Sequence, residues 1–141
     1  MKKLILLLLT LILVSCGASS TKTSEKPLFE VLTQQSFGGA GIHFFEILSE
    51  PNEIIMLQND ENLKNKISSA DIQTSNFIIF NMGEKPTGGY KIGVESVVET
   101  DKNIIITVKE TTPEPNAIVS QVLTNPFCVV KINSKKAIII K

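Results

Sequence analysis

The chain has 141 residues, and its 14 basic residues, all lysines, balance 14 acidic ones, so the formal net charge is zero. This length holds one domain, and a chain without arginine or excess positive charge is a poor candidate for binding nucleic acid or anionic lipid. One histidine and two cysteines are too few to indicate a metal site, and we predict neither a metal nor a cofactor.

Residues 1–15 have the pattern of a lipoprotein signal peptide. Lys2 and Lys3 precede an apolar run over residues 4–14, and the small-residue sequence Leu-Val-Ser-Cys follows. As a helix this run would be roughly 16 Å long, about half of the hydrocarbon core of a membrane. The ending at Cys16 resembles a bacterial lipobox, in which the cysteine carries acyl chains such as palmitate. We predict a lipid-anchored protein of the bacterial cell envelope, on the periplasmic face of the outer membrane or on the cell surface; an ordinary secreted protein is the alternative.

Residues 16–27 then read as the lipidated cysteine and a flexible tether, because residues 17–27 are small, polar and without apolar periodicity. Such a tether has an average span of roughly 18 Å. With Cys16 lipidated, Cys128 has no partner in the chain, so no internal disulfide is expected. The folded domain would be residues 28–141.

The first half of the domain predicts two strands and one helix. Residues 28–33 and 42–48 are apolar enough for strands, and the glycine-rich residues 34–41 between them form a loop. Pro51 and the acidic residues beside it favour a helix start, and an apolar stripe extends the helix to about Lys64. It is the only helix that we expect.

From residue 77 the pattern is that of strands. Apolar runs predict strands over residues 77–80, 90–100, 104–109, 118–123, 127–132 and 137–140, with a bulge in the second of these. Residues 101–103 and 133–136 would turn hairpins, and the two prolines in residues 111–116 break the sheet. The expected fold is mainly β (α+β): an antiparallel β-sandwich or partly open barrel of about seven or eight short strands with one helix.

Catalysis is not expected. His43 is the one imidazole, and inside an apolar strand it is more readily a packing residue than a base. Cys128 lies among apolar residues, where a thiol behaves as a small hydrophobe. Glu46, Glu50 and Glu53 are better explained as a strand face and a helix start than as a pair of catalytic acids.

Two loop segments are the best candidates for a binding surface. Pro86 and the glycines that follow it make a tight turn, and each segment places a stiff proline beside an aromatic ring. Loops of alternate hairpins gather at one end of a sheet, so the two segments are expected to form one surface. Alternatively, the glycines only form the turn and the rings face the core. The predicted partner-binding residues are Pro86, Thr87, Gly88, Gly89, Tyr90, Asn125, Pro126 and Phe127.

The same segments carry a family resemblance. The sequence K-P-T-G-G-Y, an alternating strand, E-T-T-P-E-P and a second strand opened by T-N-P-F resemble the C-terminal domain of the PrcB family over about residues 77–132. PrcB proteins are accessory lipoproteins of a bacterial surface protease complex. The resemblance implies a protein partner, an envelope or secreted protease or its assembly intermediate, which the lipoprotein stabilises or holds at the membrane.

K-P-T-G-G-Y is also similar to the N-P-T-T-G-[FY] loop of the chagasin-type inhibitors of cysteine proteases, which are immunoglobulin-like sandwiches. Residues 125–127 lie where those inhibitors have R-P-[WF], but asparagine replaces the arginine, and the glycine-rich middle loop of that family is absent. The resemblance implies an immunoglobulin-like or chagasin-like sandwich as one form of the expected fold. Because of these departures, protease inhibition is the first alternative function and not the main prediction. A structural envelope lipoprotein is the second.

Overall fold

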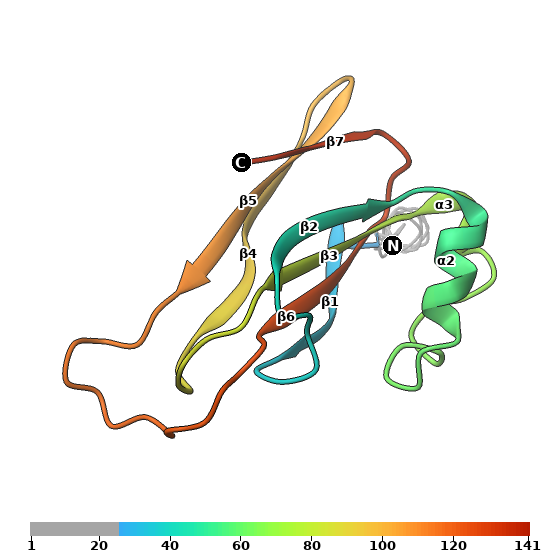
Figure 1. Cartoon of the computed structure of the whole chain (residues 1–141). Helices are drawn as coiled ribbons and strands as arrows, with labels where there is room; N and C mark the ends of the chain where they lie inside the picture. Colours follow the sequence, from blue (N-terminus) through green and yellow to red (C-terminus); the bar gives the residue numbers. More distant parts are fainter. Residues whose placement is uncertain (1–25) are drawn as a thin grey trace, which may run out of the picture.

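The computed structural model describes residues 26–141 (Figure 1). The predicted signal peptide, Cys16 and most of the predicted tether lie outside this range. The described residues form seven strands in two sheets with two short helices, which confirms the mainly-β class and is compatible with a β-sandwich. The sheets do not close into a barrel.

The first sheet has four antiparallel strands in the order β1-β6-β3-β2. Its centre is formed by the two strands whose residues are almost all buried, because both of their faces are covered. The strands are β1 (Phe29–Gln35), β2 (His43–Leu48), β3 (Asn76–Met82) and β6 (Phe127–Ile132).

The second sheet contains β4 (Lys91–Glu99), β5 (Asn103–Thr111) and β7 (Ala137–Ile140). β4 and β5 form the predicted hairpin, with the predicted irregularity between Val94 and Ser96. β7 pairs with β5 in parallel.

Two apolar clusters hold the layers together. The inner cluster lies between the two sheets and consists of Ile78, Phe80, Met82, Ile92, Ile104, Ile106, Cys128, Val130 and Ile132. The outer cluster packs the helical segment onto the other face of the first sheet and consists of Leu32, Leu48, Ile54, Leu63, Ile67, Phe77 and Val129. Period-2 alternation along β3 and β6 sends successive side chains into one cluster and then the other. Figure 1 shows the helices beside the first sheet, away from β4 and β5.

The predicted single helix was wrong in length and in number. α2 (Pro51–Gln58) begins at its proline, as expected, and the backbone N–H of Glu50 donates to Glu53 Oε2 at 3.1 Å. The helix ends at Gln58, before the polar run 59–62, and a second helix follows at α3 (Asp71–Thr74). Leu63 and Ile67 still pack in the outer cluster, but the residues that place them there form turns and not a helix. In residues 26–141 no helix has the length and apolar character needed to cross a membrane.

One strand prediction and one turn prediction also need correction. Residues 118–123 are not a strand. They belong to a long loop that is held against the turn 83–90 by backbone hydrogen bonds, which include an isolated bridge between Lys85 and Thr124. Residues 133–136 do not turn a hairpin, because β6 already has β1 on one side and β3 on the other. The chain therefore crosses to the second sheet, where the edge of β5 is open to β7.

A charged link fastens α3 to the first sheet. Lys131 of β6 and Asp71 of α3 have side chains only 11% and 5% exposed, and Lys131 Nζ lies 3.8 Å from Asp71 Oδ2 and 3.0 Å from Glu30 Oε2. Ser68 donates its backbone N–H and its hydroxyl to Asp71 Oδ2, each at 2.8 Å. Burial by itself raises the pKa of the Asp71 carboxyl, but the Ser68 hydrogen bonds and Lys131 outweigh burial, so the pKa lies below its ordinary value.

This lowered pKa predicts that acid weakens the fold. The ionised carboxylate is favoured in the folded state, so its contribution to the free energy of unfolding is present above the pKa of an unfolded aspartate, about 3.9, and is lost as pH falls through the lower folded pKa. Urea unfolding between pH 2 and pH 7 should show a smaller acid loss in Asp71→Asn than in the wild type. Asp101→Asn, at an exposed turn position, should keep the wild-type pH dependence. Equal acid loss in wild type and Asp71→Asn would contradict the assignment.

Candidate functional site

The two predicted binding segments lie against each other at one end of the molecule. The backbones of Lys85 and Thr124 exchange two hydrogen bonds, at 2.8 and 2.9 Å. The Gly88 N–H donates to the Ser120 carbonyl at 2.9 Å, and the Thr124 hydroxyl donates to the Thr87 carbonyl at 2.9 Å. We call residues 83–90 and 112–126 together the loop pole; Figure 1 shows the long loop after β5 running beside the turn that leads into β4.

The glycines of the turn support the long loop. A Cβ atom on Gly88 would lie 2.4 Å from Ser120 Oγ. Gly89 has φ of +89°, and a Cβ atom there would lie 2.9 Å from Pro113 Cγ. Both positions therefore let the two backbones approach closely, and at Gly89 the backbone conformation also favours glycine.

The predicted residues do not share one exposure. Pro86 and Gly89 are exposed, Thr87, Gly88 and Asn125 are half-buried, and Pro126 is fully buried. Because Pro126 is fully buried, it can support a contact surface from below but cannot touch a partner.

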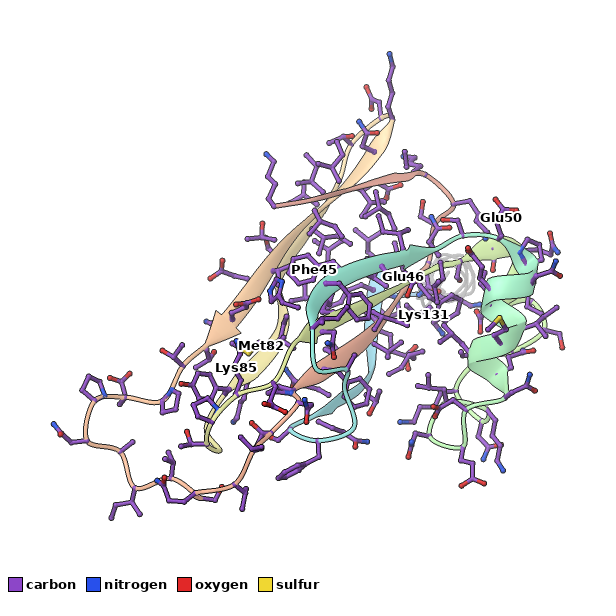
Figure 2. The ribbon with its side chains drawn as sticks, in the orientation of Figure 1. Phe45, Glu46, Glu50, Met82, Lys85 and Lys131 are labelled. Atoms are coloured by element: carbon purple, nitrogen blue, oxygen red, sulfur yellow. The ribbon has the colours of Figure 1, made fainter. Side chains whose placement is uncertain are left out.

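The two aromatic rings also separate. Tyr90 is half-buried against the inner cluster, with Lys85 Nζ 5.8 Å from its ring centroid (Figure 2 labels Lys85 near the end of β3). Phe127 is half-buried against the outer cluster. Because these clusters lie on opposite faces of the first sheet, the rings do not form the single surface that was expected.

A third segment joins the same end. Asn81 is 1% exposed, and its Oδ1 accepts from the Ala40 N–H at 2.9 Å while its Nδ2 donates to the Ala40 carbonyl at 2.9 Å and to the Ile42 carbonyl. The Gly39 N–H donates to the Asn125 carbonyl at 3.0 Å. The glycine-rich loop 36–42 is therefore tied both to β3 and to the loop pole.

Sequence reasoning missed the apolar side chains that the loop pole exposes. Ile118 is fully exposed, and Val122 and Leu123 are 47% and 61% exposed. They were assigned to a strand, where part of the set would have been buried. The signal against that strand is their spacing: two apolar pairs flank Ser120 and Gln121, which is not a period-2 pattern.

The contacts of His43 and Cys128, the two residues considered as catalytic groups, are those of structural residues. His43 Nε2 contacts Glu110 Oε1 at 2.6 Å, an exposed link between β2 and β5. Cys128 is fully buried in the inner cluster, and burial raises the pKa of its thiol to about 11, so the reactive thiolate is scarce at neutral pH. Among residues 26–141, no group of three or more histidine, cysteine or acidic side chains is placed to hold a metal ion.

Comparison with known proteins supports the resemblance in the sequence. Residues 76–133 match the family model described as PrcB C-terminal, a span that runs from β3 to just beyond β6 and contains the whole loop pole. No curated protein and no solved structure matches the chain.

Proposed function

We propose, from the match of residues 76–133 to the PrcB C-terminal model, that this protein is a non-catalytic binding module that stabilises or tethers an envelope or secreted protease. The family suggests an accessory role in a protease complex. The observation that carries the proposal is a loop pole that presents Ile118, Val122 and Leu123 to solvent from a braced loop.

The exposed side chains are suited to anchor a partner. Full burial of a side chain such as isoleucine or leucine contributes about 1.5–3 kcal/mol, and few such anchors supply most of the affinity of an interface. The hydrogen bonds from Lys85 and Gly88 to the long loop hold it in place before binding, which lowers the entropic cost of association.

The direction of the chain favours a protein over a lipid surface. The Leu28 and Pro27 carbonyls accept hydrogen bonds from Asn133, at the end of β6 remote from the loop pole. β1 leads from there to Gln35, which pairs with Phe127 at the other end of β6. With a lipid anchor on Cys16, the tether would join the domain at the remote end, so the exposed apolar residues lie at the end far from the point of attachment.

The test is capture of a protease from envelope extract by the full-length protein in detergent, with the captured proteins identified by mass spectrometry. Ile118→Asp/Leu123→Asp should reduce capture at least tenfold, because two anchors become charged. The control is Val98→Asp, an apolar residue of β4 that is 53% exposed, close to Leu123 at 61%, which should capture as the wild type does. Capture of no protease by any form would favour a structural envelope lipoprotein.

A protease inhibitor is the second candidate, favoured by the gathering of three loop segments, 36–42, 83–90 and 112–126, at one end. The accessory role predicts that the purified protein leaves the rate of a papain-like protease unchanged. Inhibition at micromolar concentration that Gly88→Trp abolishes would replace our proposal with this one.

A further inference from the structure

Two adjoining hollows cross the outer face of the first sheet, between α2 and the loop 36–42. Their volumes are about 190 and 310 Å³, and both are lined by Leu57, Asp60 and Ile79. Because they share these residues, the two hollows adjoin, and we call them together the outer groove. Figure 1 shows α2 standing beside β2 and β3, the strands whose outer side chains form its floor.

The first hollow is mainly apolar. Besides the shared residues, its walls include Phe44, Leu63, Phe127 and Val129, with the polar Thr33 and Asn62. Asn81 is also present, but its amide is engaged by the backbone of loop 36–42. The apolar walls accept an aliphatic side chain, and the charged group of the lining is the carboxylate of Asp60, which the second hollow shares.

The second hollow is lined by acidic and apolar side chains together. Glu46 of β2, Glu53 of α2 and Asp60 line it with Leu48, Met56 and Leu57. Glu53 Oε2 and Asp60 Oδ1 accept backbone N–H groups, so each of these two carboxylates has its other oxygen left for a ligand. Within residues 26–141, none of the ion pairs includes any of these three acids, and no lysine lines either hollow. In Figure 2, Glu46 lies on β2, and Glu50 lies where the chain enters α2.

We propose that the outer groove binds an extended segment of a partner protein, with an aliphatic side chain in the first hollow and a lysine or arginine in the second. Side chains two residues apart in an extended segment lie on one face, about 6.6 Å apart, and so enter neighbouring hollows. Lysine and arginine have an apolar stem and a charged head, which suit a lining that combines Met56 and Leu57 with three carboxylates. Charge complementarity therefore selects a basic segment.

This site is distinct from the loop pole, because Ile118, Val122 and Leu123 line neither hollow. The two proposals can therefore fail separately: Glu46→Lys acts on the outer groove, and Ile118→Asp/Leu123→Asp acts on the loop pole.

The test uses the peptide fluorescein-Ser-Leu-Ser-Arg-Ser-amide, which is labelled at its N-terminus, and fluorescence anisotropy with the full-length protein in neutral detergent. Saturable binding is expected. Exchange of the arginine for glutamate should weaken binding at least tenfold, because the acidic second hollow repels a carboxylate. Exchange of the leucine for glycine should weaken binding about fivefold, because the first hollow is then left empty. Binding should also weaken as salt is raised.

Glu46→Lys should weaken binding of the arginine peptide about tenfold, since it reverses one charge of the acidic hollow. The matched control is Glu95→Lys, an exposed glutamate of β4 in the other sheet, which should change the affinity less than twofold. Equal losses in the two variants, equal binding of the leucine and glycine peptides, or no saturation at millimolar protein would each overturn the proposal. Urea midpoints equal to that of the wild type show that the variants are folded.

Discussion

Replacement of Asn81 by leucine is expected to lower the free energy of unfolding by about 3 kcal/mol, because leucine has the same branched outline but can replace none of the three hydrogen bonds. The change leaves the Ala40 N–H, the Ala40 carbonyl and the Ile42 carbonyl without their side-chain partner. An unpaired buried polar group costs about 1–3 kcal/mol, and water reaching the exposed loop offsets part of the sum. Urea unfolding measures the loss.

The matched control for this change is Asn65→Leu, at an exposed position in the turns after α2, which should cost less than about 0.5 kcal/mol. The Asn81 variant should also speed amide hydrogen exchange in loop 36–42, above all at Gly39, whose N–H bonds Asn125. An unchanged urea midpoint in the Asn81 variant would mean that the amide does not hold this loop.

Replacement of Lys131 by methionine is the second large effect, and we expect a loss of about 2–3 kcal/mol at pH 7. Methionine is unbranched like lysine and only one atom shorter, so packing along the stem is little changed. What is lost is the cation beside Asp71, whose carboxylate is 5% exposed and retains only its Ser68 hydrogen bonds. Removal of one member of a buried pair leaves an uncompensated charge, which is costly. Glu30 is half-exposed and is solvated again by water.

The double variant Lys131→Met/Asp71→Asn isolates this interaction. The neutral amide no longer needs a cation beside it. The loss in the free energy of unfolding of the double variant should therefore be smaller, by at least about 1 kcal/mol, than the sum of the losses of the two single variants. Lys136→Met serves as the surface control: its partner Glu99 is 46% exposed, and the expected loss is at most about 1 kcal/mol. Additive losses in the buried pair would show that Lys131 and Asp71 do not interact energetically.

The sequence pattern predicts best the strands whose pairing is set by a turn between sequence neighbours, as in the hairpin of β4 and β5. The turn at residues 101–103 reverses the chain between β4 and β5, and Thr100 Oγ1 accepts from the Asn103 N–H at 2.9 Å. The slip in alternation near Val94 appears as a real irregularity in pairing. Turn chemistry and period 2 act over a few residues, so the sequence carries them in full.

The candidate site was only partly predictable. The prolines and glycines indicated that residues 83–90 and 124–127 are turns, and the structure brings these segments together. The exposure of single residues could not be predicted from the sequence. Pro126 was predicted to contact a partner and is buried, whereas Ile118 was predicted to lie in a strand and is fully exposed. Exposure depends on which other segments pass over a residue, and those segments are distant in the sequence.

The sequence by itself determined a mainly-β domain, the place of each of the seven described strands, the helix start at Pro51 and the family resemblance, because each rests on residues that are neighbours along the chain. Only the tertiary structure decided that β7 joins β5 in parallel, that Tyr90 and Phe127 pack on opposite faces of one sheet, and that Glu46, Glu53 and Asp60 gather at one hollow. The physical reason is that alternation separates the two faces of a strand but does not say which partner covers each face. That choice is made by long-range packing, where β6, already paired on both sides, leaves β7 the open edge of β5.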